Sequence, residues 1–206
     1  MNEKDSVAKF NFDLRRTLIL SGYMNEWGVP KGRVVIRRQN GPPIEAYSFT
    51  GGRDSKVARF ATVGVSAQKK SENKRVNHEL LFVLPSDLGG SSESEVFSYL
   101  LDISVYVLKD EVDFGIETLI PESPLAPEKW KQKAVLIDEA RGESESFESM
   151  HVGVQCVSLL WLVPIYKNEY QQIREHGIES FDHYCKQSSF SLVDTSRPSV
   201  VPIKSV

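Results

Sequence analysis

The stretch Val152–Gly177, VGVQCVSLLWLVPIYKNEYQQIREHG, carries the strongest fold signal in the 206-residue chain. Apolar residues first alternate with small or polar ones over Val152–Cys156, and then run without a break from Leu159 to Val163. Alternation is typical of a strand with one buried face, whereas an unbroken run indicates a strand that is buried on both faces. Pro164 has no N–H to donate to a sheet, so the sequence predicts that the strand ends there.

A helix is expected directly after this strand. Asn168 can cap it, and Gln171 lies three residues further on, where its side chain can return the hydrogen bond. Gly177 supplies the left-handed residue that closes such a helix. Apolar positions at helical spacing begin before the cap and continue beyond the glycine, at Tyr166, Tyr170, Ile173, Ile178, Phe181 and Cys185. Taken alone, this block is a folding unit with no recognisable catalytic pattern.

A second buried strand and a long helix are predicted upstream. Leu80–Leu84 is another unbroken apolar run, and Pro85 follows it. Ser92 and Glu95 have the spacing of a capping box, in which each side chain bonds the backbone N–H of the other residue. Apolar residues then recur with the period of a helix, at Val96, Tyr99, Leu100, Ile103 and Val107. The strongest helix of the chain is therefore expected here.

The remaining segments contribute short strands and loops. The first thirty residues have a helix-like start followed by a turn, and β-prone stretches predict strands at 34–36, 44–49, 58–65 and 134–137. Loops are predicted at the three-proline segment 117–127, at the four-glutamate segment 139–150 and in the tail 188–206, which is expected to pair weakly or fray. The fold class is therefore α+β (mixed α/β), with helices packed on a twisted, mostly antiparallel or mixed sheet.

Two segments resemble the Suppressor of Fused (SUFU) domain family. Leu160–Gly177 has the order found at the end of that domain: a buried strand, a Pro-Ile step at Pro164, a glutamate on the helix at Glu169, and a closing glycine. Arg75–Pro85, RVNHELLFVLP, looks like the glutamate-led strand of the same family, which ends in Leu-Pro and precedes a helix. The two motifs occur in the family's order, and the resemblance extends over residues 58–186.

The resemblance implies a single SUFU-like domain over residues 1–206, without the second, C-terminal domain of the longer animal protein. The chain looks like the single-domain bacterial members, and this resemblance implies an immunity protein that neutralises a cognate polymorphic toxin by direct binding. The partner would then be a toxin domain, and the protein would not be an enzyme. Two alternatives remain open: a regulatory scaffold that sequesters a transcription factor or a peptide, and an enzyme of unrecognised type.

Charge and composition argue against nucleic acid and membranes as partners. The net charge is −3 and the basic pairs are scattered, which argues against a nucleic-acid-binding surface. The start, MNEKDSVAKF, lacks the apolar segment of a signal peptide. The longest apolar stretch, 152–165, is shorter than the ~20 residues that a membrane helix needs. Two cysteines are too few for a secreted disulfide scaffold. We therefore expect a cytoplasmic protein that binds neither nucleic acid nor membrane.

Residues with reactive side chains have mainly structural interpretations. The four histidines and Cys185 do not have the spacing of zinc ligands, and the chain contains no Walker-type phosphate loop. Cys156 is expected to be a small core residue of its strand. No catalytic, cofactor or metal site is therefore predicted. Glu79 is expected to face solvent or pair with Arg75, but it would become a functional candidate if it were buried and its pKa perturbed.

Four residues are candidates for binding a partner. Glu143, Glu145 and Glu148 lie in the acidic segment 139–150, and their charges would attract a basic toxin. The alternative for these glutamates is a solvated loop without a contact role. Trp130 is either an exposed anchor for a partner or a residue packed over the sheet.

Overall fold

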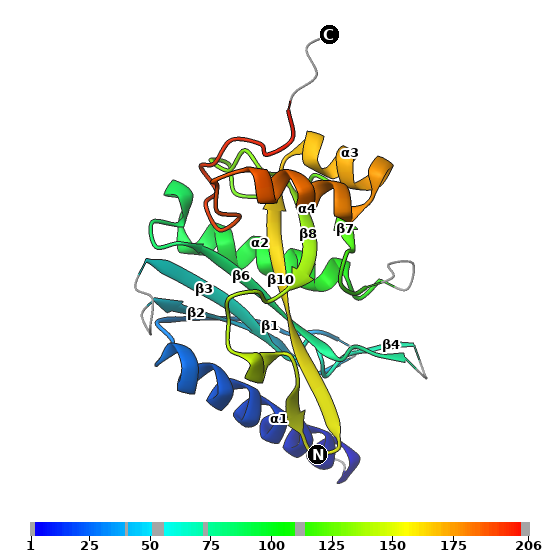
Figure 1. Cartoon of the computed structure of the whole chain (residues 1–206). Coiled ribbons are helices and arrows are strands. Elements are labelled where there is room, and N and C mark those ends of the chain that lie inside the picture. The colour runs from blue at the N-terminus through cyan, green and yellow to red at the C-terminus, as the bar shows by residue number, and fades with distance from the viewer. Residues whose placement is uncertain (1–2, 40, 51–55, 72–73, 110–113, 203–206) are drawn as a thin grey trace.

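The computed structural model describes residues 3–39, 41–50, 56–71, 74–109 and 114–202. Eight strands form one sheet in the order β1-β2-β3-β6-β10-β8-β7, and β9 pairs with the first residues of β10 (Figure 1). All pairs in this sheet are antiparallel except β6 with β10, which run parallel. The predicted mixed, mostly antiparallel sheet is therefore confirmed. The strands are β1 (Gly32–Ile36), β2 (Ile44–Thr50), β3 (Val57–Val63), β6 (His78–Pro85), β7 (Leu119–Ile120), β8 (Ala134–Glu139), β9 (Met150–Val152) and β10 (Gln155–Ile165), and β4 (Lys69–Ser71) pairs with β5 (Lys74–Arg75) in a separate hairpin.

The centre of the sheet consists of the two strands with unbroken apolar runs. Leu160 on β10 lies opposite Leu80 on β6, and both strands are buried along the paired stretch, as their sequences predict. Pro164 is paired with Val135 of β8, at a level where β10 no longer pairs with β6. The proline therefore stands inside the strand, and β10 ends one residue later than expected, because this part of the strand has only one neighbour in the sheet.

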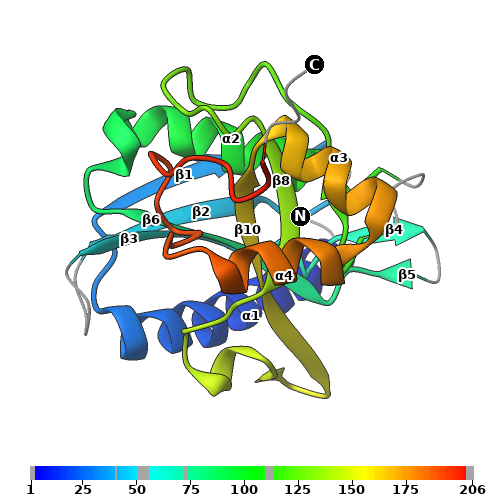
Figure 2. The ribbon, with the colours of Figure 1, turned by 45° about the horizontal axis from the view of Figure 1, so that its top comes forward.

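Helices cover both faces of this sheet (Figures 1 and 2). The helix α2 (Glu93–Tyr106) packs on one face, and α1 (Glu3–Trp27), α3 (Lys167–His176) and α4 (Ile178–Gln187) pack on the other. The predicted helix-like start and the turn after it are confirmed: one 25-residue helix extends to Trp27, and Gly28 follows it with a φ of +84°. None of the helices in the described part of the chain combines the length and apolar character required to cross a bilayer.

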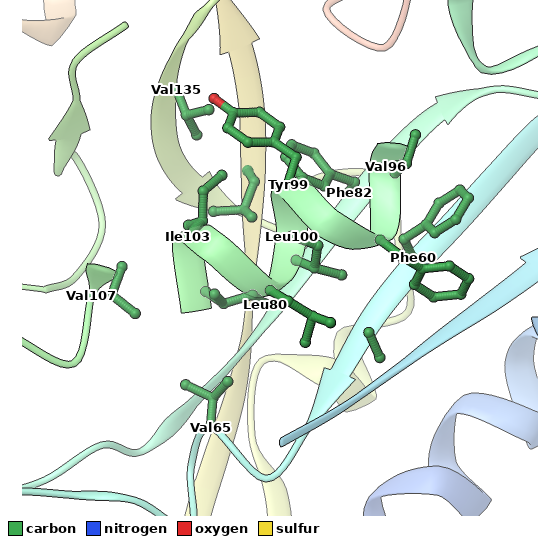
Figure 3. Close-up of a cluster of buried hydrophobic side chains, with 14 of the residues drawn as sticks. Phe60, Val65, Leu80, Phe82, Val96, Tyr99, Leu100, Ile103, Val107 and Val135 are labelled. Carbon is green, nitrogen blue, oxygen red and sulfur yellow. The ribbon is translucent and has the colours of Figure 1, made fainter. Parts of the chain in front are cut away.

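The face under α2 is filled by the residues that its periodicity predicts (Figure 3). Tyr99 stacks on Phe82 of β6 with ring centroids 5.7 Å apart, and Leu100 and Ile103 are fully buried beside them. The predicted capping box is confirmed: Ser92 Oγ accepts from the Glu95 N–H at 3.3 Å, and the Glu95 carboxylate accepts from the Ser92 N–H at 2.8 Å. Local hydrogen-bonding rules therefore set the start of this helix.

Replacing Ser92 with alanine should lower the free energy of unfolding by about 1 kcal/mol, because the Glu95 N–H loses its acceptor. Urea unfolding with an unchanged m-value is the measurement. Ser98 is exposed in the middle of the same helix, so Ser98→Ala is the matched control and should cause no loss. Equal stability of the Ser92 variant and the wild type would show that the cap does not contribute.

The start of α3 differs from the prediction. The helix begins at Lys167, and the backbone N–H of Tyr166 donates to the Glu169 carboxylate at 2.9 Å. Asn168 is therefore not the cap; its amide donates to Ser199 Oγ and to the Val201 carbonyl, both at 2.8 Å. The predicted role of Gly177 is confirmed, since it has a φ of +82° and separates α3 from α4.

Candidate functional site

The acidic segment 139–150 folds back onto the end of α1. Phe147 is only 1% exposed and lies against Tyr23 and Trp27, with ring centroids 5.7 and 4.8 Å away. The 3-10 turn η2 (Glu145–Phe147) brings it there, and Ser144 is the N-cap of this turn. The buried phenylalanine therefore fastens the segment to the protein, which corrects the expectation of a solvated loop.

Glu143 gives the segment a second attachment. Its carboxylate accepts from Arg59 Nε at 2.6 Å and from Trp27 Nε1 at 2.8 Å, and its side chain is 7% exposed. The Arg59 guanidinium also lies over the Trp27 ring, 5.7 Å from its centroid. Because both carboxylate oxygens accept hydrogen bonds inside the protein, Glu143 holds the segment in place.

The other three candidates differ in how exposed they are. Glu145 and Glu148 are exposed on the same segment. Trp130 is 1% exposed: its indole N–H donates to the Leu88 carbonyl at 3.1 Å and its ring packs edge-on against Phe82. The prediction of an exposed tryptophan anchor is therefore wrong, and the alternative of packing over the sheet is correct.

Glu79 is fully buried, contrary to the expectation that it faces solvent, and the side chain of Arg75 lies outside the described structure. One carboxylate oxygen accepts from the backbone N–H groups of Gly64 and Ser66 and from Ser66 Oγ, at 2.6–3.0 Å. The other accepts from the Val65 N–H at 3.1 Å and from Thr62 Oγ1 at 2.7 Å. With five donors on two oxygens, the carboxylate is saturated and fastens the turn after β3.

The geometry of that turn depends on a glycine. Gly64 has a φ of +109°, and a Cβ added there would lie 2.5 Å from the Pro43 carbonyl oxygen. This backbone conformation aims three successive N–H groups at one carboxylate. Burial and the nearby charge of Glu79 also raise the pKa of Tyr23 well above its usual value. Glu79 is therefore part of the structural core and holds the turn after β3 in place.

A second buried carboxylate was missed as a site by sequence reasoning. Glu169 on α3 and Arg197 in the tail form an ion pair at 2.6 and 2.9 Å, and both side chains are 0% exposed. Glu169 also accepts from the Val200 N–H at 2.8 Å. The tail up to residue 202 is thus fastened to the fold, which corrects the expectation that it frays. The sequence signals were Glu169 itself, which the family resemblance includes, and a single arginine in the serine-rich tail.

The histidines do not converge with Glu79 or with each other. His78 is half-buried, bonded through Nδ1 to Ser158 Oγ at 2.6 Å, and burial lowers its pKa. His151, His176 and His183 lie on three other elements. In the described ranges, no three His, Cys, Asp or Glu residues come close enough together to hold a metal ion.

The two thiols differ in exposure. Cys156 is exposed, which corrects the prediction of a core cysteine, and its sulfur lies 3.6 Å from His151 Nδ1. Burial raises the pKa of the Cys185 thiol to about 11.

An aromatic disulfide reagent at pH 8 should therefore modify Cys156 about a hundredfold faster than Cys185, because only the thiolate reacts. The single-cysteine variants Cys156→Ser and Cys185→Ser allow each rate to be measured alone. The rate at Cys185 should keep rising up to pH 11. Similar rates for the two thiols at pH 8 would contradict the placement of Cys185.

One surface pocket, of about 420 Å³, lies between the end of β6 and the tail. Its lining includes Lys56, Asp87 and Asp194. Asp87 accepts from the Gly89 N–H at 3.1 Å, and Asp194 accepts from the Ser196 N–H at 2.8 Å. Both carboxylates therefore stabilise their own turns, and their arrangement does not indicate a reaction.

Comparison with known proteins identifies the fold. The structure is similar to a SUFU homologue from Neisseria gonorrhoeae FA 1090, with a TM-score of 0.73 and 15% identity over 92% of this chain and 98% of that one. It is also similar to a chain of the Sufu–Fu complex, with a TM-score of 0.59 and 14% identity over 94% of this chain and 91% of that one. No curated protein sequence matches the chain.

The match to Drosophila Suppressor of Fused has a TM-score of 0.59 and 15% identity. It covers 89% of this chain but 50% of that protein, so the chain spans about half the length of the Drosophila protein. At these identities the structural matches establish the fold. The sequence itself matches the family model for Suppressor of fused protein (SUFU) over residues 40–198, and we conclude that this chain belongs to the SUFU family.

Proposed function

We propose that this chain is a cytoplasmic protein-binding module that neutralises a toxin domain by direct binding. Membership of the SUFU family supports protein binding, since one structural relative was solved as a complex of Sufu with Fu. The observation that carries the proposal is the anchored acidic segment: Phe147 and Glu143 hold it to the fold, while Glu145 and Glu148 stay exposed. Two carboxylates held on a fixed turn pay little ordering cost when they meet a basic surface.

A regulatory scaffold that sequesters a peptide segment is the second candidate function. It is favoured by the same Sufu–Fu structure, in which the relative is bound to another protein. Both candidate functions require a protein partner, and the chemistry of the partner separates them: a folded basic toxin in the first case and a short extended segment in the second.

Co-expression with a toxin domain encoded beside this chain, followed by co-purification, tests the toxin proposal. The complex should form, protect the cells, and weaken as salt is added. The variant Glu145→Lys/Glu148→Lys should bind about tenfold or more weakly, whereas the exposed control pair Glu128→Lys/Glu175→Lys should bind normally. Absence of a complex would overturn the toxin proposal, and unchanged affinity in the first variant would remove the acidic segment from it.

A further inference from the structure

The strand β1 is an edge of the sheet whose outer side is not paired. It pairs with β2 on one side, and within the described residues no strand pairs with its other side. Arg33, Val34 and Val35 in its centre are exposed. An edge strand presents the N–H and C=O groups of alternate residues to solvent, where they can accept another extended chain. Figure 1 shows β1 at the end of the strand order furthest from β7.

The charge along this edge is opposite to that of the chain as a whole. Residues 31–38, KGRVVIRR, contain four basic and no acidic residues in a protein of net charge −3. Arg33 pairs with Glu45 at 2.8 Å, and Arg38 donates to Gln68 at 2.8 Å. Lys31 and Arg37 are exposed, and neither has an ion pair or a side-chain hydrogen bond within the described residues. Two cations therefore flank the open edge without partners.

Two acidic side chains near this edge, among the residues that the structure describes, already have partners. Glu45 also accepts from Arg16 at 2.8 Å, and these hydrogen bonds lower its pKa although burial opposes the shift. Glu93 on α2 lies beside Gly32 and accepts from Ser48 Oγ. Neither carboxylate is free to neutralise the two flanking cations, so the edge keeps a positive character.

The two faces of β1 present different side chains to an incoming strand. Arg33 and Val35 lie opposite Tyr47 and Glu45, on the face that α1 covers. Val34 lies opposite Ala46, on the face that α2 covers. A strand added here would meet basic side chains at both ends of the edge and two partly exposed valines between them.

We propose that the β1 edge binds an extended acidic segment of a partner protein by strand addition. A second copy of this chain is the less favourable occupant. Antiparallel pairing of two β1 strands about Val34 and Val35 would place Lys31 opposite Arg38 of the other copy, and directly opposed like charges destabilise a sheet. The carboxylates of an acidic strand would instead attract the basic side chains of this edge. Its backbone would form hydrogen bonds with the outward N–H and C=O groups of β1.

This inference rests on the proposed function only in that the chain binds proteins. The β1 edge and the acidic segment have opposite charges and consist of different residues, so they would recognise different partners, or different parts of one partner. Each surface can therefore be tested while the other is left intact.

Fluorescence anisotropy with a fluorescein-labelled peptide, EVEVEVE, tests the inference. This peptide should bind saturably, and the Lys31→Glu/Arg37→Glu variant should bind it about tenfold or more weakly, because two attractive contacts become repulsive. The exposed residue Lys186, on α4, provides the control variant Lys186→Glu, whose affinity should be unchanged. The peptide KVKVKVK should not bind.

A proline-containing peptide, EVEPEVE, separates strand addition from simple charge attraction, because it keeps the charge but cannot complete the backbone ladder. It should bind about tenfold or more weakly than EVEVEVE. Equal binding of the two acidic peptides, unchanged binding by the Lys31→Glu/Arg37→Glu variant, or no binding of EVEVEVE would each overturn the inference. Any of these outcomes overturns only the strand-addition inference, and the proposed function stands if the Lys31→Glu/Arg37→Glu variant still co-purifies with the toxin domain.

Discussion

Replacing Arg197 with methionine is expected to lower the free energy of unfolding by about 3–5 kcal/mol, because the Glu169 carboxylate would remain buried without its cation. Arg197 donates to both oxygens of Glu169, and the pair is fully enclosed. The guanidinium also lies 5.7 Å from the centroid of the Tyr166 ring. Urea unfolding is the measurement, with the m-value checked for constancy.

Three variants separate the charge from the packing. Arg174 is exposed on α3, so Arg174→Met should change stability by less than about 0.5 kcal/mol. Arg197→Lys keeps the charge but loses the two-pronged hydrogen bond, so its loss should be smaller than that of methionine. The double variant Glu169→Gln/Arg197→Met should recover part of the stability, because it removes the uncompensated charge. A double variant less stable than Arg197→Met would contradict this account.

The Glu169–Arg197 pair depends on a contact that local sequence rules do not detect. Asn168 fits the rules for a helix cap, but it is Glu169 that accepts from the backbone N–H of Tyr166, the residue before the helix. The ion-pair partner of Glu169 lies 28 residues further along the chain. Local rules identify a capping residue from its neighbours in sequence, whereas Glu169 is held in place by Arg197 in the tail. A tail rich in serine therefore resembled a frayed end, although it contains a buried arginine.

Features with local causes were predicted well. The strands β6 and β10 follow from unbroken apolar runs, and the start of α2 follows from a capping box whose two residues are three positions apart. The direction in which single side chains point was harder to predict. Trp130 and Glu143 have sequence neighbours typical of exposed residues, but Leu88 and Arg59, distant in sequence, bond to them inside the protein. The partner-binding role of the acidic segment therefore stays a prediction, with Glu145 and Glu148 as its exposed residues.

The buried carboxylate of Glu79 leads to the second large prediction. Glu79→Ala would leave three backbone N–H groups and the hydroxyls of Thr62 and Ser66 without their acceptor. Each buried unsatisfied donor costs about 1–3 kcal/mol, and some of these donors will find water, so we expect a loss of about 4 kcal/mol. Urea unfolding measures it.

Glu79→Gln should lose less than Glu79→Ala, because the amide keeps one acceptor oxygen, while its NH₂ group faces donors where the second oxygen accepted. Glu139 is exposed at the end of β8, so Glu139→Ala is the matched control and should stay within about 0.5 kcal/mol of the wild type. Hydrogen exchange adds a local test, because the amides of Gly64, Val65 and Ser66 should exchange faster in Glu79→Gln while those of α2 change little. If these three amides stay protected in the glutamine variant, Glu79 does not fasten the turn, and its burial would need a functional explanation instead.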